Sequence, residues 1–209
     1  MNAEKLNKIE TTLRGLHKDA KKDYMRIGKG LVKSIFKPMQ PKDFEQAYLP
    51  ISKAQGEHLR NLILENKSKF IVEFGTSFGI STIYLAQAAK QIGGKVISTE
   101  LLESKVITAK KNIEDAGLSD HVEIRTGDAM KTLGDLAEPI DFLFLDGWKN
   151  LYLPLFEMLE PNFHSGTLIY SDNMDMSDTE DLATYLFNNK DKYETQVLEN
   201  GKAFLSKVI

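Results

Sequence analysis

A chain of 209 residues can fold as one domain with a sizeable core, but it is too short for two full α/β domains. It contains no cysteine, which excludes disulfide bonds, thiolate metal sites and mechanisms that use a cysteine nucleophile. The net charge of −3 is uneven, since residues 1–42 carry eleven Lys or Arg against four acidic residues. A basic first segment could contact nucleic acid, an anionic membrane surface or an acidic subunit, but the preferred interpretation is a solvated helix face that packs on its apolar side.

Residues 1–51 are predicted to form a helical extension. Apolar residues recur at helical spacing in two stretches, one through Leu6, Ile9, Leu13 and Leu16 and one through Met25 or Ile27, Leu31 and Ile35, before Pro38 and Pro41. These stripes should bury one face on the body of the protein or on a second copy, so we expect a homodimer. No stretch is apolar enough for a signal peptide or a membrane span, so we expect a cytoplasmic protein without a membrane partner.

Residues 52–209 are predicted to form one α/β domain. Ser52 and Gln55 form a capping box that starts a helix to about Lys67, and Ser177 and Glu180 form another that starts a helix to Phe187. Between them, predicted strands (70–74, 95–99, 122–125, 140–145, 167–170) alternate with predicted helices (81–89, 104–116, 129–136, 151–159). This alternation favours a parallel sheet with helices on both faces.

The chain is predicted to end in an antiparallel hairpin. Two strand-like runs, 193–198 and 202–208, flank Asn200 and Gly201, a dipeptide typical of a tight turn. The fold class is therefore α/β, with a Rossmann-like, seven-stranded, mostly parallel sheet that ends in an antiparallel hairpin strand, plus N-terminal helices.

A ligand site is predicted where the first strand turns into its helix. Gly75 and Gly79 lie in that turn, with G-x-x-x-G spacing rather than the G-x-G-x-x-G of pyrophosphate binders. Glu100 ends the second strand, where a carboxylate can accept both ribose hydroxyls, and Asp128 follows the third, where it can accept from an adenine amino group. A strand-end glutamate and a helix cap are the alternative readings for these two residues.

Taken together with Glu73, these residues line one predicted crevice at the carboxyl ends of three successive strands. The set resembles the class I S-adenosylmethionine-dependent methyltransferases, whose first strand carries an E-x-G-x-x-x-G turn, and the resemblance covers residues 52–209. It implies S-adenosylmethionine as cofactor. The implied cofactor contacts are Glu73, Gly75, Thr76, Ser77, Gly79, Ser81, Glu100, Leu101, Asp128, Ala129, Asp146 and Trp148.

Oxygen-bearing side chains also follow the fourth and fifth strands. Asp146 ends the fourth strand, and Asp172 and Asn173 end the fifth, so a site for Mg²⁺ or Ca²⁺ is predicted there. Zinc or copper is not expected, because the sequence has no cysteine and its four histidines are not paired.

These two segments resemble the cation-dependent catechol and caffeoyl-coenzyme A O-methyltransferases. The animal catechol enzymes carry L-D-H-W-K and a later A-D-N, and this chain reads L-D-G-W-K at 145–149 and S-D-N at 171–173. By that resemblance Asp146, Asp172 and Asn173 would hold a divalent metal, and Lys149 would be the general base. An aryl hydroxyl, with a pKa of about 10, needs such help to become a nucleophile at neutral pH.

Two positions depart from the catechol enzymes. Gly147 replaces their histidine, which is expected to open space, and Glu194 is a poorly aligned counterpart of their C-terminal glutamate, so catechol itself is not assigned as the substrate. Three parts of the chain are expected to form the acceptor pocket: the basic segment (1–42), residues 48–52 and residues 174–176. The expected acceptor is a small aromatic, dihydroxy molecule that is methylated on one hydroxyl.

Two rival functions use the same crevice. An NAD-dependent oxidoreductase would need Glu100 but not the three metal-site residues together. A methyltransferase acting on nucleic acid usually carries N-P-P-Y or D-P-P-Y after the fourth strand, and residues 145–148 do not match it. Nucleic acid is therefore not the expected partner.

Overall fold

The computed structural model describes residues 3–23, 26 and 40–209. The second predicted N-terminal helix, through Met25 or Ile27, Leu31 and Ile35, lies outside the described residues. The first is helix α1 (Ala3–Ala20), which is followed by a 3₁₀ turn (Pro41–Phe44) and helix α3 (Lys53–Asn66). No helix in the described part of the chain is both long enough and apolar enough to span a bilayer.

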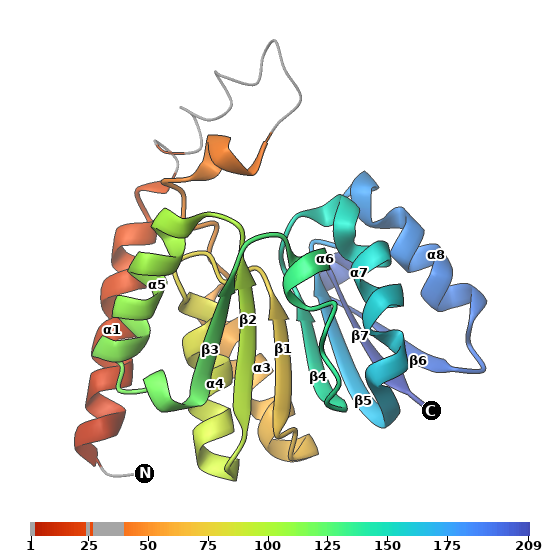
Figure 1. Ribbon diagram of the computed structural model, residues 1–209, viewed down its shortest axis with the longest axis horizontal. Coiled ribbons are helices and arrows are strands. Elements are labelled where there is room, and N and C mark those ends of the chain that lie inside the picture. Colours follow the sequence, from red (N-terminus) through yellow and green to blue (C-terminus); the bar gives the residue numbers. More distant parts are fainter. Residues whose placement is uncertain (1–2, 24–25, 27–39) are drawn as a thin grey trace.

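A seven-stranded sheet forms the centre of the molecule, with strand order β3-β2-β1-β4-β5-β7-β6 (Figure 1). The strands are β1 (Phe70–Phe74), β2 (Lys95–Glu100), β3 (Val122–Thr126), β4 (Ile140–Leu145), β5 (Phe163–Asp172), β6 (Tyr193–Leu198) and β7 (Ala203–Val208). Strands β1 to β5 pair in parallel, and β7 runs antiparallel to both β5 and β6. The predicted seven-stranded, Rossmann-like sheet with a C-terminal antiparallel hairpin is confirmed.

Helices cover both faces of this sheet. The other helices are α4 (Ile80–Ile92), α5 (Glu103–Asp115), α6 (Ala129–Thr132), α7 (Tyr152–Leu159) and α8 (Glu180–Asn188). Side chains alternate between the faces along each strand: Phe142 and Phe144 pack with α1, α3 and α4, whereas Leu143 and Leu145 pack with α6, α7 and α8. Continuous apolar strands are therefore required, because both faces are buried.

Helix α1 buries its apolar stripe on the body of the same chain. Ile9, Leu13 and Leu16 are all buried and belong to the core cluster that includes Tyr84 of α4 and Ile113 of α5. Packing within one chain therefore accounts for the apolar stripe of α1. The expected homodimer and the predicted boundary between residues 51 and 52 stay predictions.

Two local predictions were wrong in detail. No side chain caps α8; residues Ser177–Thr179 form a 3₁₀ turn instead, and the Thr179 hydroxyl donates to the Met176 carbonyl at 2.7 Å. The hairpin connection is longer than a two-residue turn, with positive φ at Glu199, Asn200 and Gly201. In both places an additional local turn satisfies backbone groups that the simple motif would have left to a side chain or a tighter loop.

Candidate active site

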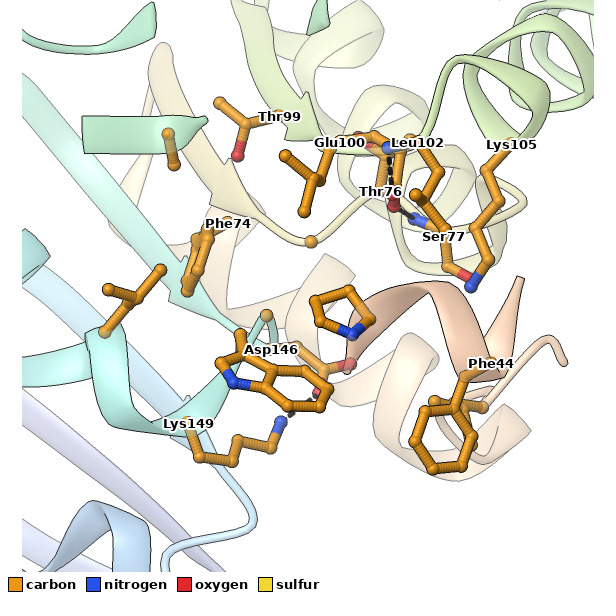
Figure 2. A pocket seen from close by; sticks show the side chains of 18 of the residues that line it. Phe44, Phe74, Thr76, Ser77, Thr99, Glu100, Leu102, Lys105, Asp146 and Lys149 are labelled. Carbon is orange, nitrogen blue, oxygen red and sulfur yellow. Dashed lines mark hydrogen bonds and ion pairs between the residues drawn. The ribbon is translucent and has the colours of Figure 1, made fainter. Parts of the chain in front are cut away.

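A cavity of about 940 Å³ opens at the carboxyl ends of the parallel strands (Figure 2). Its walls come from the turns after β1, β2, β3, β4 and β5, and from the segment 40–51, which joins the N-terminal region to α3. Because parallel strands all end at the same edge of the sheet, residues far apart in sequence meet here. The predicted site residues that line it are Gly75, Thr76, Ser77, Ser81, Glu100, Leu101, Asp128, Ala129, Asp146, Trp148, Lys149, Asp172 and Asn173.

Gly75 allows the ends of β1 and β4 to approach one another. Its φ of +106° suits glycine, and a Cβ at this position would lie 2.6 Å from the carbonyl oxygen of Asp146. Gly79 has a φ of +87° and starts α4, but it does not line the cavity. The first glycine therefore shapes the cavity wall, and the second shapes the start of the helix behind it.

Glu73 also lies behind the wall, although the sequence placed it among the cofactor contacts. Its side chain is fully buried and accepts hydrogen bonds from the hydroxyls of Thr82 and Ser98. Burial raises the pKa of Glu73, and the hydroxyl donors act in the opposite direction. In this position Glu73 ties β1, β2 and α4 together beneath the turn.

Glu100 holds the turn from the other side of the cavity. One carboxylate oxygen accepts from the Ser77 amide and the other from the Leu102 amide, both at 2.9 Å (Figure 2). Each carboxylate oxygen has more than one acceptor site, so two ribose hydroxyls can still donate to this group. Glu100 is therefore fixed in orientation before any ligand arrives.

Asp128 caps helix α6, as the alternative reading of the sequence had it. Its carboxylate accepts from the Met130 amide at 3.0 Å. Asp128 and Ala129 nevertheless line the cavity, so the cap and a ligand contact are compatible at this position.

Lys149 reaches the cavity from a 3₁₀ turn (Lys149–Leu151) directly after β4. Its ammonium group lies 3.1 Å from a carboxylate oxygen of Asp146 and 2.9 Å from the hydroxyl of Tyr152 (Figure 2 shows the first contact). Residues three apart eclipse each other in a 3₁₀ turn, which explains why Lys149 and Tyr152 meet. No sequence pattern marks Tyr152 as a site residue, because it has the pattern of an ordinary core aromatic.

Asp146, which is partly buried, and Asp172, which is buried, are two carboxylates at neighbouring strand ends. Burial raises the pKa of Asp146 to about 7; the charge of Asp172 adds to this rise, and Lys149 opposes it. Burial likewise raises the pKa of Asp172, which Gln55 and Lys149 oppose. Two carboxylates that resist ionisation side by side are an arrangement that a divalent cation would stabilise.

Asn173 completes the candidate metal site with an amide. Its φ of +58° lies in the left-handed region, which asparagine tolerates better than most residues. Two carboxylates and an amide oxygen fit a hard divalent cation. Within the described ranges no group of three or more His, Asp or Glu side chains forms a metal cluster, so the fit depends on this amide.

The two departures from the catechol enzymes have structural answers. A Cβ at Gly147 would lie 2.5 Å from the Phe74 ring, so the space expected there is filled by an aromatic side chain. Glu194 is exposed on β6, opposite Lys207, and does not line the cavity. Glu194 is therefore not placed to hold a substrate hydroxyl.

The segment 40–51 covers the cavity beside Ser77. Tyr48 stacks on Phe78 with ring centroids 4.3 Å apart, and its carbonyl accepts from the Ser77 hydroxyl at 2.8 Å. Of the ranges expected to form the acceptor pocket, Tyr48, Leu49, Pro50, Ile51 and Met176 line the cavity, whereas Ser52, Met174 and Asp175 do not. Sequence reasoning had therefore located this part of the wall.

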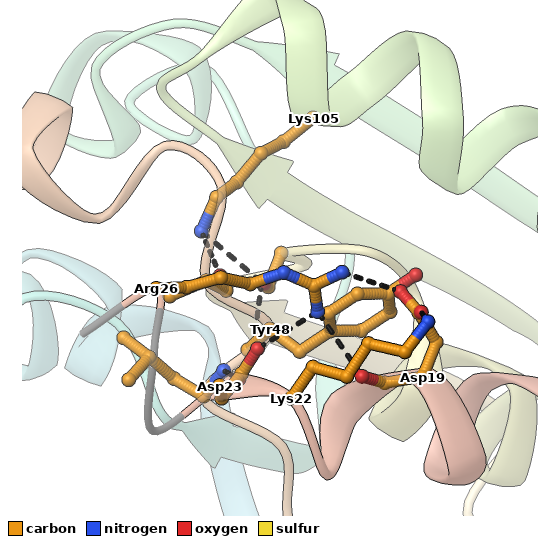
Figure 3. Close-up of polar contacts among 9 residues, drawn as sticks. Asp19, Lys22, Asp23, Arg26, Tyr48 and Lys105 are labelled. Carbon is orange, nitrogen blue, oxygen red and sulfur yellow. Dashed lines mark hydrogen bonds and ion pairs between the residues drawn. The ribbon is translucent and has the colours of Figure 1, made fainter. Parts of the chain in front are cut away.

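A polar cluster anchors this segment to α1 and α5 (Figure 3). Arg26 pairs with Asp19 at 2.7 Å and with Asp23 at 3.0 Å, and lies over the Tyr48 ring. Lys105 donates to the Ala47 carbonyl at 3.0 Å and to the Ser77 hydroxyl at 3.2 Å. Burial lowers the pKa of Lys105, which the sequence had not marked as a cavity residue.

Known proteins resemble this chain in sequence and in fold. Residues 72–174 match the family described as a methyltransferase domain. The chain is 37% identical over 130 residues to a catechol O-methyltransferase of Niastella koreensis and 32% identical over 127 residues to one of Mycobacterium tuberculosis. Each alignment covers 60% of this chain, and 58% and 57% of those two relatives. The alignments thus span less than two thirds of the relatives' own lengths.

Solved structures extend the similarity over most of the chain. An O-methyltransferase from Bacillus cereus, in complex with SAH, superposes with a TM-score of 0.69 at 25% identity, over 88% of this chain and 97% of the other. A methyltransferase from Podospora anserina, also bound to SAH, has a TM-score of 0.72 over 100% of this chain and 89% of the other, but at 14% identity it shows the fold alone. The chain therefore has the class I methyltransferase fold. Its resemblance to the S-adenosylmethionine-dependent O-methyltransferases is confirmed.

Proposed function

We propose that this protein transfers a methyl group from S-adenosylmethionine to a hydroxyl oxygen of a small aromatic, dihydroxy acceptor, with help from a divalent cation. The observation that carries the proposal is the position of Lys149 beside Asp146 and near Asp172, in the cavity that Glu100 lines from its opposite side. Relatives named catechol O-methyltransferase support an acceptor with neighbouring hydroxyls. The apolar side chains of Pro50, Trp148 and Met176 along the cavity suit an aromatic ring.

Each side chain would have one role. Glu100 would accept the ribose hydroxyls, and Asp128 with Ala129 would contact the adenine end. Asp146, Asp172 and Asn173 would hold Mg²⁺ or a similar cation, which lowers the pKa of a hydroxyl bound to it. Lys149 would take the proton of the acceptor hydroxyl, and the cavity walls would align that oxygen with the methyl group.

The proposal is tested by incubating the protein with methyl-labelled S-adenosylmethionine and a panel of dihydroxy-aromatic acceptors. We expect turnover with Mg²⁺, none with a chelator, and recovery when Mg²⁺ is restored. Asp172→Ala should lose cation binding and turnover together. Turnover that persists in the chelator would show that the cation-assisted mechanism is wrong.

Calorimetry separates the cofactor assignment from its rivals. S-adenosylhomocysteine should bind with micromolar affinity, whereas NAD should not bind measurably. Tight binding of NAD alone would instead favour an oxidoreductase.

A further inference from the structure

The Asp172 side chain is held by a residue from a distant part of the chain. The amide nitrogen Nε2 of Gln55, in the first turn of α3, lies 2.8 Å from Oδ1 of Asp172. Both side chains are buried, with exposures of 7% and 8%. Gln55 does not line the cavity, so it approaches the carboxylate from the protein side.

The Gln55 side chain makes this contact in place of a local hydrogen bond to the backbone amide of Ser52. In a capping box the third residue of the helix turns its side chain back to the N-cap amide. Here the Ser52 hydroxyl does accept from the Gln55 amide at 3.1 Å, but the Gln55 side chain extends to Asp172 instead. Only half of the predicted box is formed, and the other half is replaced by a contact across 117 positions of the sequence.

Close packing fixes the position of the Gln55 backbone. Its neighbour Gly56 lies against the Tyr84 ring of α4, where an added Cβ would be 2.4 Å from ring carbons. The first turn of α3 cannot move toward α4 without a clash. The hydrogen bond from the Gln55 amide to the Ser52 hydroxyl also restricts rotation of this turn about the helix axis. The amide is thereby held at a set distance from the end of β5.

Chemistry fixes which end of the amide faces Asp172. An ionised carboxylate only accepts hydrogen bonds, so the Gln55 NH₂ group must point toward it. A neutral amide donor orients the carboxylate and leaves its negative charge in place. A lysine or arginine in the same position would cancel that charge. The remaining acceptor capacity of Asp172 is then available to a cation.

We infer that Gln55 is a positioning residue for the divalent-cation site, and that it acts by holding Asp172 in the orientation that binds the ion. This inference rests on the proposed function, because it takes Asp172 as a metal ligand. Groups that hydrogen-bond to ligating side chains commonly contribute about 10- to 100-fold to metal affinity. We expect a contribution in that range from Gln55.

The test measures Mn²⁺ binding to the full chain from the electron paramagnetic resonance signal of free Mn²⁺. Gln55→Met keeps the length of the side chain and removes the donor, and it should weaken Mn²⁺ binding by about 10- to 100-fold. Affinity for S-adenosylhomocysteine, measured by calorimetry, should change less than about threefold, because no Gln55 atom lines the cavity. A purely structural role would weaken both ligands together.

Two further variants complete the experiment. Gln87→Met makes the same change at a buried glutamine in α4, outside the cavity wall, and should leave Mn²⁺ affinity at the wild-type value. If Gln55→Met does not fold, Gln55→Asn keeps the polarity but withdraws the amide by one methylene, and should show the same loss.

The outcomes separate this inference from the proposed function. Equal Mn²⁺ affinity in wild type and in the folded Gln55 variant overturns the inference alone. A wild-type protein that binds S-adenosylhomocysteine but no Mn²⁺ overturns the cation-assisted function as well.

Discussion

The ammonium group of Lys149 lies 2.9 Å from the hydroxyl oxygen of Tyr152, a side chain that is fully buried. That hydroxyl also lies within donating distance of two carbonyl oxygens, 2.8 Å from Leu145 and 3.1 Å from Asp172. One phenol therefore joins the lysine to the ends of β4 and β5. Because its proton is used by a carbonyl, its lone pairs are available to the lysine.

Tyr152→Phe removes this link while keeping the ring. We expect kcat to fall on the order of 10-fold, about 1.4 kcal/mol, because Lys149 loses one of its two acceptors and part of its alignment. Cofactor affinity should be unchanged. Steady-state kinetics on an active acceptor would measure both. Tyr185→Phe, which removes a hydroxyl bonded to Glu160 outside the cavity wall, is the matched control and should retain full kcat.

Lys149→Met tests the base itself. The substitution should lower kcat by roughly 10² to 10⁴, the usual contribution of a positioned base, with cofactor and cation still bound. Single-turnover kinetics would show whether the methyl-transfer step is the one that slows. Unchanged turnover in this variant would remove Lys149 from the mechanism.

Glu100→Gln tests the cofactor site. Replacing the charged acceptor should weaken S-adenosylhomocysteine binding by about 1 to 3 kcal/mol, through lost bonds to the ribose and a looser Ser77 turn. Calorimetry gives the value directly. Glu103→Gln, an exposed change three residues later, provides the comparison and should bind as wild type. If the two variants bind equally well, Glu100 does not hold the cofactor.

The surroundings of His164 predict that stability depends on pH. This residue lies near the start of β5, at the end of the strands opposite the cavity. The Ser165 carbonyl and Asp141 raise the pKa of His164 above its ordinary 6.5, so the protonated ring is favoured in the folded state. Its stabilising contribution is complete below pH 6.5 and is lost as the pH rises through the raised value.

Thermal unfolding between about pH 5.5 and 8.5 would measure this effect. The Tm of wild type should fall relative to that of His164→Asn as the pH rises. The difference should be small, because the ion pair with Asp141 is partly exposed to solvent. Parallel pH curves for the two proteins would contradict the assignment.

The sequence by itself determined the architecture and most of the cavity wall. Apolar runs such as Phe70–Phe74 and Ile140–Leu145 can only be buried on both faces, so they specify a parallel sheet covered by helices. Residues that follow those runs, including Glu100, Asp146 and Asp172, must then meet at one edge. A local sequence pattern is sufficient to predict the cavity wall, because the fold brings the carboxyl ends of the parallel strands together.

Only the tertiary structure decided what each side chain contacts. Gln55 reaches Asp172, Tyr152 joins two strand ends, and Phe74 fills the space at Gly147. Glu73, which matches the cofactor motif in sequence, is buried behind the wall as a support. These outcomes depend on packing between elements distant in sequence, where a difference of an ångström selects the partner, and no local pattern of residues carries that information.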